Sequence, residues 1–121
     1  DYCRLFRVLY NATYLNRSMS EKALKCLTEC GFVDGLVAGV PPSLTIAHKF
    51  GERGFKDSTI KQLHDCGVVY YPNNPYIIGV MTQGTDFKEQ EKAISAISKL
   101  IYEEINGQMH RPAPQHISIM D

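Results

Sequence analysis

The sequence predicts an α+β fold, in which an antiparallel sheet of three strands is packed by amino-terminal helices and by one long carboxy-terminal helix. Three runs rich in β-branched and aromatic residues follow one another between positions 43 and 82. The Pro-Asn-Asn-Pro sequence at 72–75 separates the second run from the third, which favours an antiparallel hairpin. Apolar residues at helical spacing precede and follow these runs.

Two helices are expected before the sheet. In the first sixteen residues Leu5, Phe6, Leu9 and Tyr10 recur at helical spacing, which indicates an amphipathic helix with one face to bury. The second helix is expected to begin at Ser18, because Ser18-Met-Ser-Glu21 has the spacing of a capping box, and to end at Gly31. The glycines and prolines between 35 and 42 predict a loop into the first strand.

The three strands are expected at 43–51, 66–71 and 76–82. Side chains alternate along a strand, so His48 and Phe50 share one face of the first strand with Leu44 and Ile46, while Lys49 lies on the other face. On an apolar face His48 is expected to be packed rather than catalytic. The strand then ends with a lysine followed two residues later by a glycine, Gly51.

The third strand is apolar on both faces, which predicts a central strand covered on both sides. The chain offers it only one neighbour, the second strand of the hairpin. Its other edge would leave backbone donors and acceptors unpaired, an arrangement that folded proteins avoid. The sheet is therefore expected to be incomplete within these 121 residues.

A long helix is expected from a cap at Asp86 to about Asn106, closed by Gly107. Its apolar stripe consists of four isoleucines at spacings of three and four, namely Ile94, Ile97, Ile101 and Ile105. Residues 108–121 contain two prolines and predict a poorly ordered tail.

Composition excludes several classes of function. Thirteen basic and thirteen acidic side chains cancel and form no basic cluster, so nucleic acid is not an expected partner. No apolar run approaches the roughly 20 residues that span a bilayer. The four cysteines show no Cys-x-x-Cys spacing, and His64-x-Cys66 is too sparse for a zinc site, so they are expected to be buried or free thiols.

Three sequence features together resemble a known family. The first strand ends in Lys-Phe-Gly after Pro41-Pro42, the second in Val-Tyr-Tyr-Pro, and the third begins Tyr-Ile-Ile-Gly-Val. This order resembles the carboxy-terminal sheet of the penicillin-recognising serine hydrolases, the class A β-lactamases and their D,D-peptidase-like relatives. That family carries a Lys-Thr-Gly strand, a Ser-x-x-Lys nucleophile motif and a Ser-Asp-Asn loop. Only the first of these has a counterpart here.

The resemblance implies that residues 1–107 are the carboxy-terminal part of a β-lactamase-like α/β sandwich. The missing strands, which would pair with the open edge, and the nucleophilic serine would lie in amino-terminal sequence of the same enzyme. It further implies a small-molecule or peptidoglycan-peptide substrate, an extracellular, periplasmic or cell-envelope location, and no metal or organic cofactor.

The same resemblance implies roles for residues around Lys49. Lys49 would bind the substrate carboxylate, Gly51 would let the substrate backbone approach, and the backbone N–H of Glu52 would supply half of the oxyanion hole. Arg53 either assists carboxylate binding or is a charge at the rim. Phe50 departs from the family, which has Thr or Ser there with a hydroxyl that contacts the carboxylate. A solvated lysine on an edge strand is the alternative interpretation of Lys49.

Ser58-Thr-Ile-Lys61 also has the Ser-x-x-Lys spacing. About half of one such match is expected by chance in this composition, and the motif follows the lysine strand instead of preceding it. A loop between the first and second strands is therefore the favoured interpretation, with an independent hydrolase using Ser58 as the alternative. The function expected from the sequence is acyl transfer to a serine outside this chain. The segment alone would be inactive, and the second hypothesis is an inactive remnant or binding module of the same fold.

Overall fold

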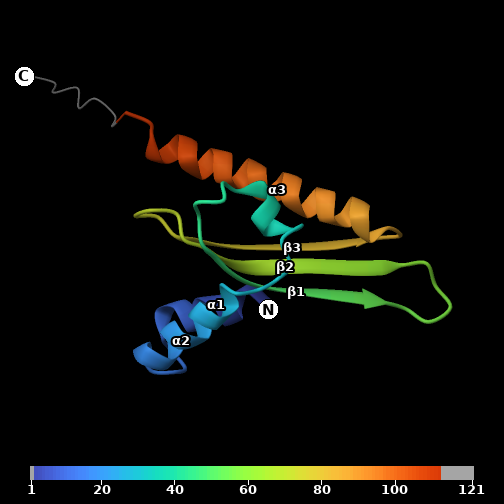
Figure 1. The fold of residues 1–121 in the computed structure, drawn as a ribbon, viewed down its shortest axis with the longest axis horizontal. Helices are drawn as coiled ribbons and strands as arrows, with labels where there is room; N and C mark the ends of the chain where they lie inside the picture. The colour runs from blue at the N-terminus through green and yellow to red at the C-terminus, as the bar shows by residue number, and fades with distance from the viewer. Residues whose placement is uncertain (1, 113–121) are drawn as a thin grey trace, which may run out of the picture.

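A three-stranded sheet separates two groups of helices in the computed structural model, which describes residues 2–112. Two helices lie on one side of the sheet, and a long helix with a short 3₁₀ helix lies on the other (Figure 1). The elements are α1 (Tyr2–Asn11), α2 (Arg17–Leu27), η1 (Leu36–Gly39), β1 (Ile46–Gly54), β2 (Lys61–Val69), β3 (Tyr76–Gly84) and α3 (Phe87–Met109). The predicted α+β class and its order of elements are confirmed.

The strands pair antiparallel in the order β1-β2-β3, with β2 in the centre. Ile46 pairs with Val69 at one end of β1 and Gly54 with Lys61 at the other, while β3 pairs with β2 from Tyr76 to Gly84. The third run is thus an edge strand in the described part of the chain, with β2 as its partner there. The prediction of one partner is confirmed, and the outer edge of β3 carries no strand within residues 2–112.

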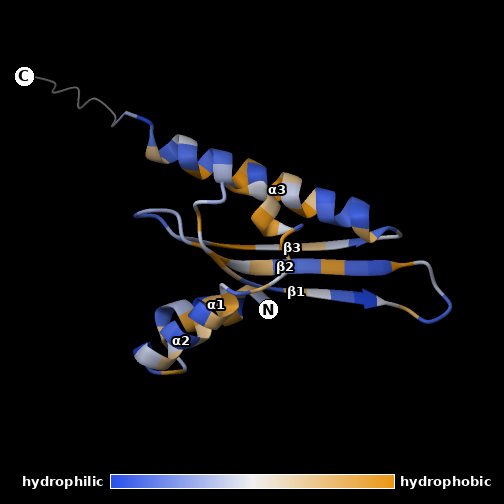
Figure 2. Cartoon of the chain, in the orientation of Figure 1, coloured by the Kyte–Doolittle hydropathy of each residue, from blue (hydrophilic) through white to orange (hydrophobic). Residues whose placement is uncertain are grey.

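Both β1 and β2 extend further toward their shared hairpin than the apolar runs predicted. The strand that was expected to end at Gly51 continues to Gly54, and the strand expected to begin at Cys66 begins at Lys61. Figure 2 shows that this end of the hairpin is mainly hydrophilic. The strands continue here although the residues are polar, because the backbone hydrogen bonds between two strands in register form whether or not the side chains are buried.

Each face of the sheet has its own apolar core. On one face Ile46, Leu63 and Val80 pack with Leu36 of η1 and Ile94 of α3. The other face forms a second core with the two amino-terminal helices. Its buried members are Phe6, Leu24, Ala47, Cys66 and Val68. The alternation predicted for β1 is confirmed, since Ile46 and Ala47 belong to opposite cores.

The helix ends differ in detail from the predictions. The N-cap of α2 is Asn16, whose side chain accepts a hydrogen bond from the N–H of Met19 at 2.9 Å, so the prediction of a capping box at Ser18 was wrong. The helix also ends at Leu27, before Gly31. For α3 the Asp86 cap is confirmed, with its carboxylate accepting from the N–H of Lys88 at 2.9 Å.

The buried face of α3 is more polar than its isoleucine stripe predicted. Gln90, Ile94 and Ser98 are buried, whereas Ile97 and Ile101 are 41% and 40% exposed. The Ser98 hydroxyl donates to the Leu36 carbonyl oxygen at 2.8 Å, which fixes η1 against the helix. The helix runs through Gly107 to Met109, and most of the predicted tail, residues 113–121, lies outside the described residues. None of the helices within 2–112 has the length and apolar composition to cross a bilayer.

Candidate functional site

The outer edge of β1 exposes backbone groups beside Lys49. The N–H of Tyr70 donates to the Thr45 carbonyl oxygen at 3.0 Å in the register that continues along β1 and β2. Bonded and non-bonded pairs alternate in an antiparallel ladder, so the N–H and C=O groups of Phe50 and Glu52 point away from β2. In the described part of the chain this edge has no neighbouring strand. A donor from Glu52 and an acceptor from Phe50 therefore face the same open side.

The Lys49 side chain is exposed and folds along this edge. Its amine donates to the Phe50 carbonyl oxygen at 2.7 Å and lies 4.9 Å from the centroid of the Phe50 ring. An ammonium group carries three N–H donors, and that bond uses one of them. The amine thus sits next to the outward backbone groups of β1, where it can meet an incoming anion.

Phe50 and Gly51 lie on opposite sides of the strand. The Phe50 ring packs on the core between the sheet and α3, and it stacks on Phe32 with ring centroids 4.5 Å apart. The predicted orientation toward the core is confirmed. A Cβ built on Gly51 would meet no atom within 4 Å among the described residues, so the space above this glycine is open.

Arg53 and Glu52 are both exposed, but Arg53 is not gathered with Lys49. Four residues of extended strand separate the two cations by about 13 Å between their Cα atoms. The Arg53 guanidinium carbon lies 4.7 Å from the centroid of the Phe55 ring, at the hairpin end of the sheet. The structure therefore brings together Lys49, Phe50, Gly51 and the backbone of Glu52, and places Arg53 further along the strand.

A buried polar network behind Lys49 was not predicted from the sequence. The His48 Nδ1–H donates to one carboxylate oxygen of Asp65 at 2.8 Å, and the Leu36 N–H donates to the other at 3.0 Å. His48 and Asp65 are 1% and 0% exposed. The expectation that His48 is packed is confirmed. The sequence feature that could have predicted this network is Asp65, because an acidic residue among apolar strand residues needs a hydrogen-bond partner when it is buried.

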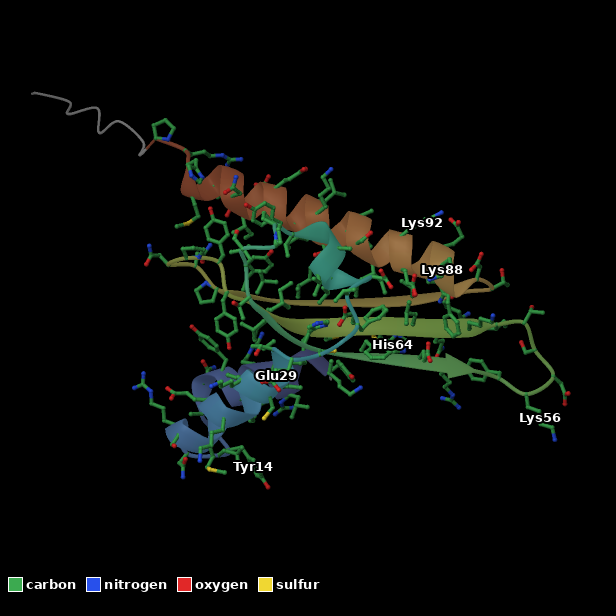
Figure 3. All side chains as sticks on the ribbon, in the orientation of Figure 1. Tyr14, Glu29, Lys56, His64, Lys88 and Lys92 are labelled. Carbon is green, nitrogen blue, oxygen red and sulfur yellow. The ribbon has the colours of Figure 1, made fainter. Side chains whose placement is uncertain are left out.

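His64, which the sequence analysis considered only as a zinc ligand, lies on β2 close to this edge. It pairs with Gly51 across the sheet, and it lies on the same face of β2 as Cys66, the partner of Lys49. Its Nδ1 is buried and has no hydrogen-bond partner among the described residues. Figure 3 labels His64 on the sheet.

Ser58 and Lys61 do not form a nucleophile and base. Residues 55–60 connect β1 to β2, and Figure 3 shows Lys56 at the tip of this hairpin. The Ser58 hydroxyl oxygen accepts from the Ile60 N–H at 3.1 Å, and the Lys61 amine lies 5.0 Å from the centroid of the Phe87 ring. Without a helix to place the lysine beside the serine, the predicted loop is confirmed.

Comparison with solved structures shows where this fold occurs. A β-lactamase from Chitinophaga pinensis is 24% identical with a TM-score of 0.78, and the match covers 87% of this chain and 40% of that one. A representative class A β-lactamase from Bacteroides cellulosilyticus is 22% identical with a TM-score of 0.77, covering 87% and 40%. The structure of PBP-A is 20% identical with a TM-score of 0.73, covering 88% and 38%.

The chain thus spans about 40% of the length of the β-lactamase structures it resembles. No curated protein sequence matches it significantly. The family model described as the beta-lactamase enzyme family matches residues 1–105, nearly the whole described chain. By this match the chain belongs to the β-lactamase enzyme family, and its fold is that of the sheet and helices found in class A β-lactamases.

Proposed function

We propose that this chain is the carboxy-terminal part of a serine hydrolase that forms an acyl-enzyme with β-lactams or D-Ala-D-Ala-type amides. Residues 1–107 would form this part of the catalytic domain, together with the last turn of α3 to Met109. The nucleophilic serine and the strands that pair with β3 would belong to amino-terminal sequence of the same enzyme. The family match and the coverage of about 40% of each related β-lactamase structure support this division.

The observation that carries the proposal is the open edge of β1. The Lys49 amine lies beside backbone groups that have no strand partner in the described chain. A carboxylate at this edge would accept charge-assisted hydrogen bonds from Lys49, each worth about 1.5–3 kcal/mol. The outward N–H of Glu52 would stabilise the developing oxyanion, and one such donor is worth about 3 kcal/mol of the activation barrier.

The proposed reaction has two steps. The serine hydroxyl oxygen forms a bond to the amide carbonyl carbon, the carbon–nitrogen bond breaks, and the leaving nitrogen takes a proton. Water then attacks the ester and releases the acyl group as an acid, which regenerates the serine. This chemistry uses no metal or organic cofactor. Substrates of this kind occur at the cell envelope, so we place the enzyme in the envelope, the periplasm or outside the cell.

Phe50 supports the alternative, an inactive remnant or binding module of the same fold. Its ring is held in the core against Phe32, so position 50 offers no hydroxyl to a substrate carboxylate. Gly51 leaves space for a substrate backbone, and Arg53 would contribute at the rim of the site. In this alternative the protein would bind a ligand at the same surface without forming an acyl-enzyme.

A labelled penicillin tests the proposal. The 121-residue chain alone should remain unmodified in an intact-mass measurement, whereas the longer protein that contains it should gain one acyl group on a serine upstream of Asp1. Lys49→Gln in the longer protein should slow acylation by about 10- to 100-fold. Lys56→Gln, which removes a charge at the exposed hairpin tip, is the matched control and should leave the rate unchanged.

The other outcomes contradict the proposal in different ways. An adduct on Ser58 of the isolated chain would show an independent hydrolase. A longer protein that folds and takes up no penicillin would favour the binding module. Equal acylation rates for Lys49→Gln and Lys56→Gln would show that Lys49 does not bind the substrate carboxylate.

A further inference from the structure

Two cysteines on different elements meet above the centre of the sheet. Cys3 lies on α1 and Cys66 on β2, and Cys66 is the register partner of Gly79 on β3. A Cβ built on Gly79 would lie 2.8 Å from the Cys66 Sγ and closer still to the Cys3 Sγ. The two sulfur atoms thus flank one small space, which exists because position 79 has no side chain.

The two thiols differ in access to solvent. Cys66 is 1% exposed, whereas Cys3 is half-buried. Both line a surface pocket of about 820 Å³ between α1 and β3, together with Arg4 and Arg7. Burial, followed by the neighbouring Cys3 thiol, raises the pKa of Cys66 to about 12. In the 121-residue chain a small oxidant can therefore reach Cys3 through the pocket, while Cys66 lies behind it.

We propose that Cys3 and Cys66 form an intramolecular disulfide by exchange with an anionic small-molecule disulfide. The Cys3 thiolate attacks one sulfur of that disulfide, whose sulfur–sulfur bond breaks and releases one thiol. The Cys66 thiol then loses its proton and attacks the Cys3 sulfur, which releases the second thiol. The two cysteines are oxidised and one disulfide is reduced to two thiols. Arg4 and Arg7 supply positive charge at the pocket for the carboxylates of such a reagent.

The cross-link would join α1 to the middle of the sheet. It would close a long loop of the chain that contains α2, η1 and β1, and long loops gain the most from a cross-link in the chain-entropy description. Cys66 is also the register partner of Lys49, so the disulfide would anchor β2 directly beside the edge proposed to bind substrate. That last consequence rests on the proposed function, whereas the formation of the disulfide does not.

Mass spectrometry tests the pairing in the 121-residue chain. With Cys26→Ser and Cys30→Ser to remove the other thiols, treatment with oxidised glutathione should remove the mass of two hydrogen atoms. A Cys3–Cys66 cross-linked peptide should then appear in a non-reducing digest. The melting temperature should rise by roughly 5–15 °C and return after reduction with dithiothreitol.

Two single variants in the same background test the order of attack. Cys66→Ser should take up one glutathione on Cys3, and Cys3→Ser should remain unmodified at Cys66. If the serine substitutions impair folding, the natural sequence treated with oxidised glutathione and mapped in the same way gives the same test. Thiols that stay free, stable glutathione adducts on both cysteines, or cross-links between two chains would each overturn the proposal.

Discussion

Replacing Asp65 by alanine should remove a large part of the stability of this fold. The carboxylate is 0% exposed and accepts hydrogen bonds from the His48 ring at 2.8 Å and from the Leu36 N–H at 3.0 Å. Alanine satisfies neither donor, and both remain buried. Breaking a buried ionic or charge-assisted pair from one side costs about 3–5 kcal/mol, against a total of about 5–15 kcal/mol for a typical domain.

Urea denaturation followed by circular dichroism measures this effect. With a slope of about 1.5 kcal/mol per molar urea, the midpoint should fall by about 2–3 M. Asp34→Ala is the matched control, because Asp34 is an exposed acid near the same 3₁₀ helix. Its midpoint should change by less than about 0.5 M, since surface substitutions alter stability by about 0.5 kcal/mol or less.

A double-mutant cycle separates the pair from the surrounding packing. His48→Ala and Asp65→Ala together should cost less than the sum of the two single changes, by about 1.5–3 kcal/mol, because each single variant already removes their shared hydrogen bond. Additive costs would show that the two residues do not interact in solution. A loss below about 1 kcal/mol for Asp65→Ala would refute the whole assignment of a structural network.

Three further predictions concern the helix cap, high pH and position 50. Asn16→Ala should destabilise the fold by about 1 kcal/mol in urea melts and Ser18→Ala by less, because the cap is Asn16; equal costs would contradict this. Because folding raises the pKa of Cys66 to about 12, its contribution to stability should be complete below pH about 8.5 and fall as pH rises toward 12. In urea melts across that pH range, this group should lower the free energy of unfolding by at most about 1.4 kcal/mol per pH unit, and Cys66→Ala should reduce the dependence of stability on pH. Phe50→Thr should lower the free energy of unfolding by about 1–3 kcal/mol, because it removes the stack on Phe32. In the longer protein the new hydroxyl should speed acylation by penicillin about tenfold. An unchanged rate would show that a hydroxyl at position 50 does not contribute to substrate binding.

Local patterns were enough to predict which segments form helices and strands. The β-branched runs, the turn at 72–75 and the Asp86 cap all correspond to elements of the structure. The boundaries toward the hairpin were missed because Glu52 to Gly54 and the start of β2 are polar, and polar residues pair well where one sheet face meets solvent. Similarly, Asn16 and Ser18 both suit an N-cap, so residue type alone does not select between them, and the structure has Asn16.

The surroundings of Lys49 were harder to predict, because they depend on contacts between distant segments. Alternation alone placed Phe50 toward the core and Lys49 away from it. No local pattern links His48 to Asp65, which lies on the next strand, or Asp65 to the backbone of η1. The meeting of Cys3 and Cys66 over Gly79 also requires the packing of α1 on the sheet.

The buried network explains why the exposed lysine stays at the edge. Side chains alternate with a period of two, so a slip of β1 by one residue would turn Lys49 toward the core that contains Leu36 and Ile94, and would turn His48 toward the opposite face. The slip would take the His48 ring away from the Asp65 carboxylate and would desolvate the Lys49 ammonium group beside that carboxylate, and the desolvation costs several kcal/mol. The His48–Asp65 hydrogen bond therefore fixes the register of β1. That register directs the Phe50 carbonyl and the Glu52 N–H outward, so a residue pair with no proposed chemical role determines which backbone groups a substrate would meet.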